Sequence, residues 1–237
     1  MLDPPNPFQK FVMSTPIPPN KPQATRILLV DDHPVVRDGF ADVINREPDL
    51  TVCAVAEDRA GALQAIETSR PNLAVIDLTL KNSSGMELIK DIQVQRPGLL
   101  ILVVSMHNEN LYAERVLRAG ARGYITKQQA TRDILQAIRR VLSGGIYLNE
   151  ATGAAVLARL SAKPQTEGDA VLDLLTDREL QVFELTGQGF NTREIAGQLH
   201  IDMKTVETYR LRIKEKLNLE TSSDLLKLAI RWKQDRL

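Results

Sequence analysis

The chain has 237 residues, a length that fits one large domain or two small ones. Hydrophobic residues make up 43% of it and charged residues 25%, as in ordinary globular proteins. The sequence has no run of about 18 uncharged apolar residues and no signal-peptide pattern, so we expect a cytoplasmic protein with no membrane partner. The 30 basic and 30 acidic residues cancel, which argues against bulk electrostatic binding of nucleic acid. Any DNA-binding surface must therefore be local.

The N-terminal segment, residues 1–25, holds seven of the twelve prolines and shows no hydrophobic periodicity. Such a segment buries too little apolar surface to offset its ordering entropy, so we predict a disordered tail. The one cysteine, Cys53, lies in the apolar run 51–56. It can form no internal disulfide, and we expect a buried, inert side chain in a strand.

From Arg26 onward, short apolar runs alternate with amphipathic helical patterns. The runs are 27–30, 51–56, 73–76, 99–104 and 123–125, and the helical patterns are 35–44, 60–66, 86–92, 111–117 and 134–142. This alternation predicts a five-stranded parallel sheet with helices on both faces. The uninterrupted apolar runs fit strands that are buried on both sides. Residues 26–143 are therefore expected to form an α/β domain.

Residues 144–175 begin with two glycines and have the composition of a linker, with a short helix near 150–160. The remaining segment, 176–237, shows helical patterns only. We expect it to form a separate, all-α domain.

Four helices are predicted in this second domain. Thr176 and Glu179 form a capping box at the start of the first helix, and Thr192 is expected to cap the second. A third helix covers about 203–217, and the fourth begins at Ser222 or Ser223.

Polar side chains follow four of the predicted strands. In an open parallel sheet, ligands bind beyond the carboxyl ends of the strands, so these side chains converge on one rim. They are Asp31, Asp32, Asp77, Ser105 and Lys127. A single aspartate at such a position commonly caps a helix, but the convergence of five polar groups favours a binding site.

Three neighbouring carboxylates raise one another's pKa unless a cation neutralises them, and Mg²⁺ suits such an oxygen-rich cluster. Lys127 and Ser105 would supply a positive charge and a hydroxyl to a metal-bound phosphoryl group. The rim therefore predicts transfer of a phosphoryl group onto a carboxylate.

Four segments of the α/β domain resemble the receiver domain of two-component signalling. They are Leu28-Leu-Val-Asp-Asp-His-Pro34, Val75-Ile-Asp-Leu78, Val103-Val-Ser-Met106 and Gly123-Tyr-Ile-Thr-Lys127. The resemblance implies a flavodoxin-like, doubly wound fold in which Asp77 is the phosphoacceptor. It also implies that Asp31, Asp32 and Asp77 hold Mg²⁺ together with the backbone carbonyl of Thr79. Ser105 and Tyr124 resemble the switch pair of the family, and the loop after Asp77 lacks the Met-Pro that many receivers have.

The third predicted helix of the C-terminal domain concentrates positive charge. Residues 203–217 carry five basic and two acidic side chains. The whole segment 176–237 carries eleven basic and ten acidic side chains. An apolar stripe of Val206, Ile213 and Leu217, together with Tyr209 or Arg210, is expected to pack on the core. The residues expected to face outward or flank the stripe are Lys204, Thr205, Glu207, Thr208, Arg212 and Lys216. This arrangement suits a recognition helix in the major groove of DNA, and charge alone leaves open a solvated face of a helical bundle.

Three segments of this domain resemble the LuxR-type helix-turn-helix: Leu175-Thr-Asp-Arg-Glu-Leu-Gln-Val-Phe-Glu184, Asn191-Thr-Arg-Glu-Ile-Ala196 and Lys204-Thr-Val-Glu-Thr-Tyr-Arg210. With a receiver in front of it, the chain resembles the NarL/FixJ family of response regulators. The resemblance implies a sensor histidine kinase and double-stranded DNA as partners, and a homodimer after phosphorylation. Glu207 departs from the basic residue of many relatives and leaves base preference open.

We therefore expect a transcription factor that is not an enzyme, in which phosphorylation of Asp77 controls DNA binding. One alternative is a signalling adaptor whose C-terminal helices bind protein. Another is an aspartyl-phosphate phosphatase or phosphotransferase, which needs a second acid–base carboxylate and a substrate-capping insertion that we do not find in the sequence.

Overall fold

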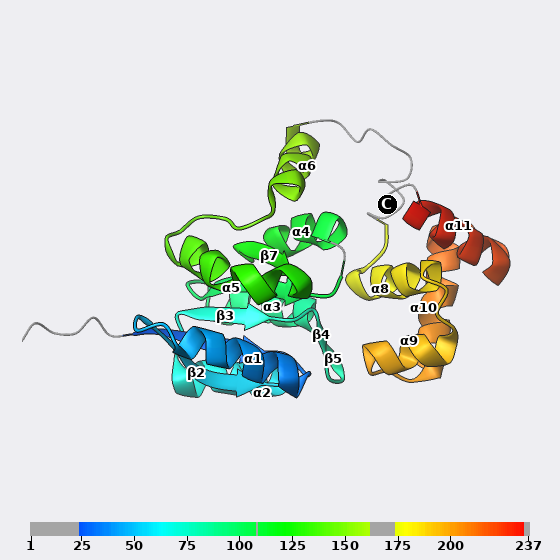
Figure 1. Cartoon of the computed structure of the whole chain (residues 1–237). Coiled ribbons are helices and arrows are strands. Elements are labelled where there is room, and N and C mark those ends of the chain that lie inside the picture. The colour runs from blue at the N-terminus through cyan, green and yellow to red at the C-terminus, as the bar shows by residue number, and fades with distance from the viewer. Residues whose placement is uncertain (1–23, 108, 162–173, 235–237) are drawn as a thin grey trace, which may run out of the picture.

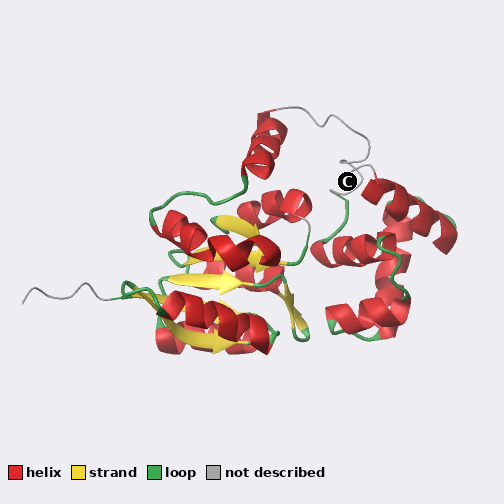
Figure 2. Cartoon of the chain, viewed as in Figure 1, coloured by secondary structure: helices red, strands yellow, loops and turns green. Residues whose placement is uncertain are grey.

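The computed structural model describes residues 24–107, 109–161 and 174–234. It confirms the predicted fold class, a five-stranded parallel sheet with helices on both faces, followed by a helical domain (Figures 1 and 2). The strand order is β2-β1-β3-β6-β7, with every pair parallel. The predicted disorder of the tail falls almost wholly on residues that lie outside this description.

The elements of the first domain begin and end close to the predicted positions. The sheet strands are β1 (Thr25–Val30), β2 (Leu50–Ala56), β3 (Leu73–Ile76), β6 (Leu100–Ser105) and β7 (Gly123–Thr126). The helices are α1 (Pro34–Asn45), α2 (Arg59–Ser69), α3 (Gly85–Gln95), α4 (Glu109–Arg118) and α5 (Lys127–Leu142). The short helix expected near 150–160 is α6 (Glu150–Ser161).

Alternate residues of the central strands pack on opposite helix layers, which explains their continuous apolar character. Leu28 and Ile76 belong to a core with α2, α3 and α4, whereas Leu29 and Val75 belong to a second core with α1 and α5. The first core continues into the helical domain, because buried residues of both domains form one cluster.

The edge strand β2 differs from the prediction of burial on both sides. It pairs only with β1, and residues 51–54 are partly exposed while Val55 is exposed. Cys53 is accordingly half-buried rather than buried, with its thiol donating to the carbonyl of Ile27 at 3.4 Å. Burial raises the pKa of the Cys53 thiol, which keeps it in the less reactive protonated form.

The loop after Asp77 contains a small antiparallel hairpin that the sequence did not predict. Its strands are β4 (Thr79–Leu80) and β5 (Ser83–Ser84), and Asn82 between them has a φ of 52°. Asparagine tolerates this left-handed conformation better than most residues. The hairpin projects from the edge of the sheet toward the helical domain (Figure 1).

The described part of the second domain, residues 174–234, contains four helices. They are α8 (Asp177–Gly187), α9 (Thr192–Leu199), α10 (Met203–Lys216) and α11 (Ser222–Gln234). The capping box of Thr176 and Glu179 is confirmed. The cap of α9 is Asn191 rather than Thr192, since the Asn191 side chain accepts from the amides of Arg193 and Glu194. In the part of the chain that the structure describes, no helix is long and apolar enough to cross a membrane.

Gly85 begins α3 where the chain passes over the backbone of Asp77. A Cβ atom on Gly85 would lie 2.0 Å from the Asp77 carbonyl oxygen and 2.7 Å from the Leu78 Cα. Both neighbours are backbone atoms and cannot rotate away, so a side chain here would displace the loop that carries Asp77.

We therefore expect Gly85→Ala to lower the free energy of unfolding by about 1–3 kcal/mol, as overpacked sites do. Urea denaturation followed by circular dichroism measures the change. Gly98→Ala is the control, because no atom lies within 4 Å of the added Cβ there. Equal stability of both variants would contradict the close approach at Gly85.

Candidate functional site

The predicted rim residues meet at the carboxyl edge of the sheet. The Lys127 ammonium, at the start of α5, lies 2.7 Å from Asp31 Oδ2 and 2.7 Å from Asp77 Oδ2. All three side chains are less than a tenth exposed. A buried lysine thus bridges the carboxylates that follow β1 and β3.

The charges in this pocket shift one another's protonation. Burial raises the pKa of the Asp77 carboxyl and Asp31 adds to the rise, while Lys127 opposes both without cancelling them. Burial alone would lower the pKa of Lys127, but the two carboxylates outweigh it and raise that pKa. The lysine therefore stays protonated and holds one positive charge against the two carboxylates.

Asp32 completes the acidic cluster and has a buried oxygen without a donor. Asp31, Asp32, His33 and Asp77 each offer one ligand atom, and these atoms lie within 4.8 Å of one another. His33 Nδ1 lies 2.7 Å from Asp32 Oδ1, but the geometry is not that of a hydrogen bond, so this oxygen has no hydrogen-bond donor. An orphaned carboxylate oxygen beside two more carboxylates fits a hard, oxygen-binding cation such as Mg²⁺.

The remaining predicted receiver residues surround His107, which sequence reasoning missed. The Thr79 amide donates to Asp77 Oδ1 at 3.3 Å, and its hydroxyl lies 3.1 Å from His107 Nε2. The His107 amide donates to the buried Ser105 hydroxyl at 3.4 Å. Tyr124 is buried with its ring inward, and its hydroxyl donates to the His107 carbonyl at 2.9 Å.

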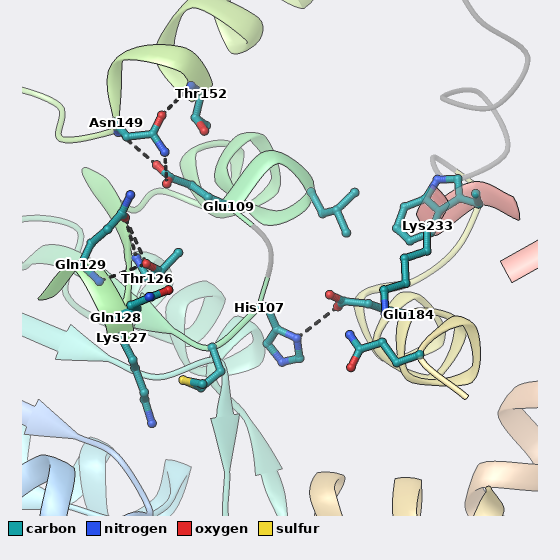
Figure 3. Close-up of a pocket in the computed structure, with 14 residues that line it drawn as sticks. His107, Glu109, Thr126, Lys127, Gln128, Gln129, Asn149, Thr152, Glu184 and Lys233 are labelled. Carbon is teal, nitrogen blue, oxygen red and sulfur yellow. Dashed lines mark hydrogen bonds and ion pairs between the residues drawn. The ribbon is translucent and has the colours of Figure 1, made fainter. Parts of the chain in front are cut away.

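The His107 imidazole also reaches the second domain. Its Nδ1 lies 3.1 Å from Glu184 Oε2 of α8, and the Tyr112 hydroxyl donates to the same oxygen at 3.2 Å. Figure 3 shows His107 and Glu184 pointing toward one another across a cleft of about 500 Å³ between the domains. The chain's one tryptophan, Trp232 of α11, lines this cleft and packs edge-on against Phe183.

Further ion pairs and hydrogen bonds hold α8 against the receiver-like domain. Asp177 lies 2.8 Å from the Lys90 ammonium and 3.1 Å from the Arg115 guanidinium. Arg178 donates to the carbonyl of Ser83 at the β4–β5 hairpin. The helical domain is therefore docked beside the acidic pocket.

One contact joins the helical domain to the pocket itself. Nε2 of His200, the residue that ends α9, lies 2.8 Å from Asp32 Oδ2. Residues 200–202 lie just before the third predicted helix, and the sequence predicted no role for them. No pattern in the sequence could have placed this turn against a carboxylate about 170 positions earlier in the chain.

Helix α10 presents the side chains predicted to contact DNA. Val206 and Ile213 are buried and Tyr209 and Leu217 pack on the core, which confirms the apolar stripe. The polar set Lys204, Thr205, Glu207, Thr208, Arg212 and Lys216 lies outside that stripe, with Thr205 partly buried and the others exposed.

Two members of this polar set contact side chains of other helices in the domain. Glu207 accepts from the Thr192 hydroxyl at 2.6 Å, and Arg210 donates to the same hydroxyl at 2.7 Å. Lys216 lies 2.6 Å from Glu179, the residue that closes the capping box of α8. Lys204, Thr208 and Arg212 therefore form the more accessible part of the surface.

A buried, lysine-bridged aspartate at the carboxyl edge of a doubly wound sheet, followed by a helix-turn-helix, defines the class of two-domain response regulators. Residues 27–139 match the model of the response regulator receiver domain, and residues 173–229 match that of the bacterial regulatory proteins of the luxR family. The chain belongs to this family of response regulators with a LuxR-type DNA-binding domain.

Similar proteins cover most of the chain. Oxygen regulatory protein NreC of Staphylococcus epidermidis is 30% identical over 213 residues, which cover 88% of this chain and 98% of that protein. Transcriptional activator protein ExaE of Pseudomonas putida is 38% identical over 209 residues, which cover 86% of this chain and 95% of that protein. A solved structure of two RcsB dimers bound to two parallel DNAs is 26% identical with a TM-score of 0.54, and covers 87% of this chain and 98% of that one.

The Glu179 carboxylate contributes to the stability of the DNA-binding domain through its contacts with Lys216 and Thr176. Burial raises its pKa, but the hydrogen bonds with Lys216 and Thr176 outweigh burial and leave the pKa of Glu179 below its ordinary value. A lowered carboxyl pKa stabilises the fold above the pKa of the unfolded chain, and this stability is lost as the pH falls through the folded pKa.

At pH 7 we expect Glu179→Gln to lower the free energy of unfolding by about 1 kcal/mol, because the amide keeps an acceptor but loses the charge. The difference from wild type should shrink on acidification, as measured by urea denaturation at several pH values. Glu194→Gln, at the corresponding exposed position of the α9 capping box, should cost less. A difference independent of pH would contradict the assigned role of the Glu179 charge.

Proposed function

We propose that Mg²⁺-dependent phosphorylation of Asp77 by a sensor histidine kinase controls dimerisation and DNA binding by α10. The observation that carries this proposal is the buried Asp77–Lys127–Asp31 cluster, next to which the DNA-binding domain is docked. The proposal rests on two domains, 26–143 and 176–237, joined by the segment 144–175.

The residues of the pocket have distinct parts in the proposed reaction. An Asp77 oxygen attacks the phosphorus of the kinase phosphohistidine, and the P–N bond breaks as the P–O bond forms. Lys127, already 2.7 Å from Asp77, compensates the negative charge of the product. Asp31, Asp32, Asp77 and the Thr79 carbonyl would hold Mg²⁺, which supplies further positive charge to the phosphoryl oxygens when bound.

The docked helical domain supplies the link from phosphorylation to DNA. Asn82 of the β4–β5 hairpin lines the same cavity as Asp202 and Met203 at the start of α10. Recognition helices contact bases through their N-terminal residues, so the receiver lies next to the end of α10 that would enter the groove. Phosphorylation would alter the contacts of Ser105 and Thr79 with His107, and through His107 the contact with Glu184.

The first experiment measures intact mass after incubation with acetyl phosphate and Mg²⁺. We expect one added phosphoryl group on the wild-type protein and none on Asp77→Asn, since the amide is not a nucleophile. Light scattering should then show a phosphorylation-dependent dimer for wild type only. Addition to both proteins would place the phosphoacceptor elsewhere, and an identical mass change in the scattering experiment would sink the role of Asp77 in dimerisation.

The second experiment separates a DNA-binding protein from an adaptor that binds protein. Affinity for DNA should fall steeply with salt, because phosphate contacts release counterions. Arg212→Ala should weaken binding and reduce the slope of log affinity against log salt by about one. Lys227→Ala on α11 is the matched control and should leave the slope unchanged. A DNA affinity that does not depend on salt would favour the alternative, an adaptor whose C-terminal helices bind protein.

A further inference from the structure

The three carboxylates of the pocket are contacted from different parts of the chain. Lys127 contacts Asp31 and Asp77, and both come from the receiver domain. Asp32 contacts His33 at one oxygen and His200 at the other. Among these three partners, only His200 belongs to the DNA-binding domain. The helix-turn-helix therefore supplies one of the two imidazoles that contact the third carboxylate.

The backbone holds His200 in place for this contact. His200 has φ 51° and ψ 47°, the left-handed conformation at the end of α9 where glycine is the favoured residue. The His200 amide donates to the Gly197 carbonyl and the Ile201 amide to the Ala196 carbonyl, which closes the helix end. A non-glycine residue in this conformation is strained and points to a role for its side chain.

The position of His200 conflicts with a hydrated cation. Mg²⁺ loses its water reluctantly and keeps several water ligands when it binds to carboxylates. The His200 imidazole lies 2.8 Å from Asp32 Oδ2, and the Asp32 side chain is only 5% exposed. A cation at the donor-free Oδ1 would have to keep its water ligands beside this imidazole. The turn that carries His200 covers that side of the pocket.

We propose that His200 and Mg²⁺ compete for Asp32, so that metal binding and docking of the helix-turn-helix oppose each other. The inference deepens the proposed function and rests on it, since Asp32 is taken to be a ligand of Mg²⁺. By reciprocity, docking weakens Mg²⁺ binding by the same factor by which Mg²⁺ weakens docking. The metal then acts on the DNA-binding domain before any phosphoryl group is transferred.

The position of Tyr124 supports a direct route of this kind. Its ring lies inward while His107 still contacts Glu184 and His200 still contacts Asp32. An inward Tyr124 is thus compatible with docked domains. Competition at Asp32 couples the pocket to the DNA-binding domain without passing through that ring.

The test measures the Mg²⁺ dissociation constant of the full-length chain by displacement of Mn²⁺, whose free concentration is followed by electron paramagnetic resonance. The variant is His200→Gly, which removes the imidazole while glycine suits the left-handed backbone, so folding is preserved. We expect it to bind Mg²⁺ roughly fivefold or more tightly than wild type. Small-angle X-ray scattering should show wild type expanding with Mg²⁺ and the variant expanded already.

Lys90→Gln is the matched control. It removes one ion pair at another part of the same interface, and Asp177 keeps its contact with Arg115. By the same reciprocity this variant should gain far less Mg²⁺ affinity than His200→Gly, because Arg115 still holds Asp177 and docking is weakened only slightly. A similar gain in affinity for Lys90→Gln would overturn the assignment to His200.

Two further outcomes overturn the proposal. One is equal Mg²⁺ affinity of wild type and His200→Gly, and the other is failure of both proteins to displace Mn²⁺ binding with Mg²⁺. The first outcome leaves the proposed function intact if acetyl phosphate still adds one group to Asp77. Loss of that addition in wild type would instead remove the proposed function.

Discussion

The buried contact of Lys127 with Asp31 and Asp77 is the interaction on which the rest of the molecule depends. Three strands must end, and one helix must begin, at the correct residue for these groups to meet. A shift of one residue in a strand would turn its side chains to the opposite face. The contact also fixes the charge of the pocket, because two acidic groups and one basic group leave a negative excess that Asp32 increases. Such a site is costly to bury without further cations or donors. The pocket accordingly draws on its surroundings, including the neighbouring domain.

His107 and His200 connect this charge cluster to the DNA-binding domain at two separate points. His107 touches Thr79, Ser105 and Tyr124 through different atoms, and its ring faces Glu184. His200 reaches the acidic cluster directly. Two contacts of the domain interface thus involve side chains that lie at or next to the acidic pocket. Coupling between two sites needs contacts that differ between two states, and these two histidines are the places where such a difference would be felt.

Sequence patterns predicted the fold closely because the central strands are apolar at every position and are buried on both faces. Leu28 and Leu29 face opposite layers, and this is what a continuous apolar run indicates. The same rule failed for β2, since an edge strand has only one neighbour and Val55 remains exposed. The rim residues could be grouped because parallel strands end at one edge.

By contrast, His107, Glu184 and His200 carry no local signal, because the docking of two domains depends on side chains distant in sequence. Asn191 was missed as a cap for a smaller reason, since Thr192 beside it is also a favoured capping residue.

The cleft between the domains contains the only tryptophan of the chain, and this has a practical consequence. The Trp232 indole is 9% exposed where α11 borders the cleft, and it packs against Phe183 of α8. Opening of the interface changes the polarity around that indole without disturbing the receiver. Intrinsic fluorescence of the unlabelled protein therefore reports on domain separation from a single, known position.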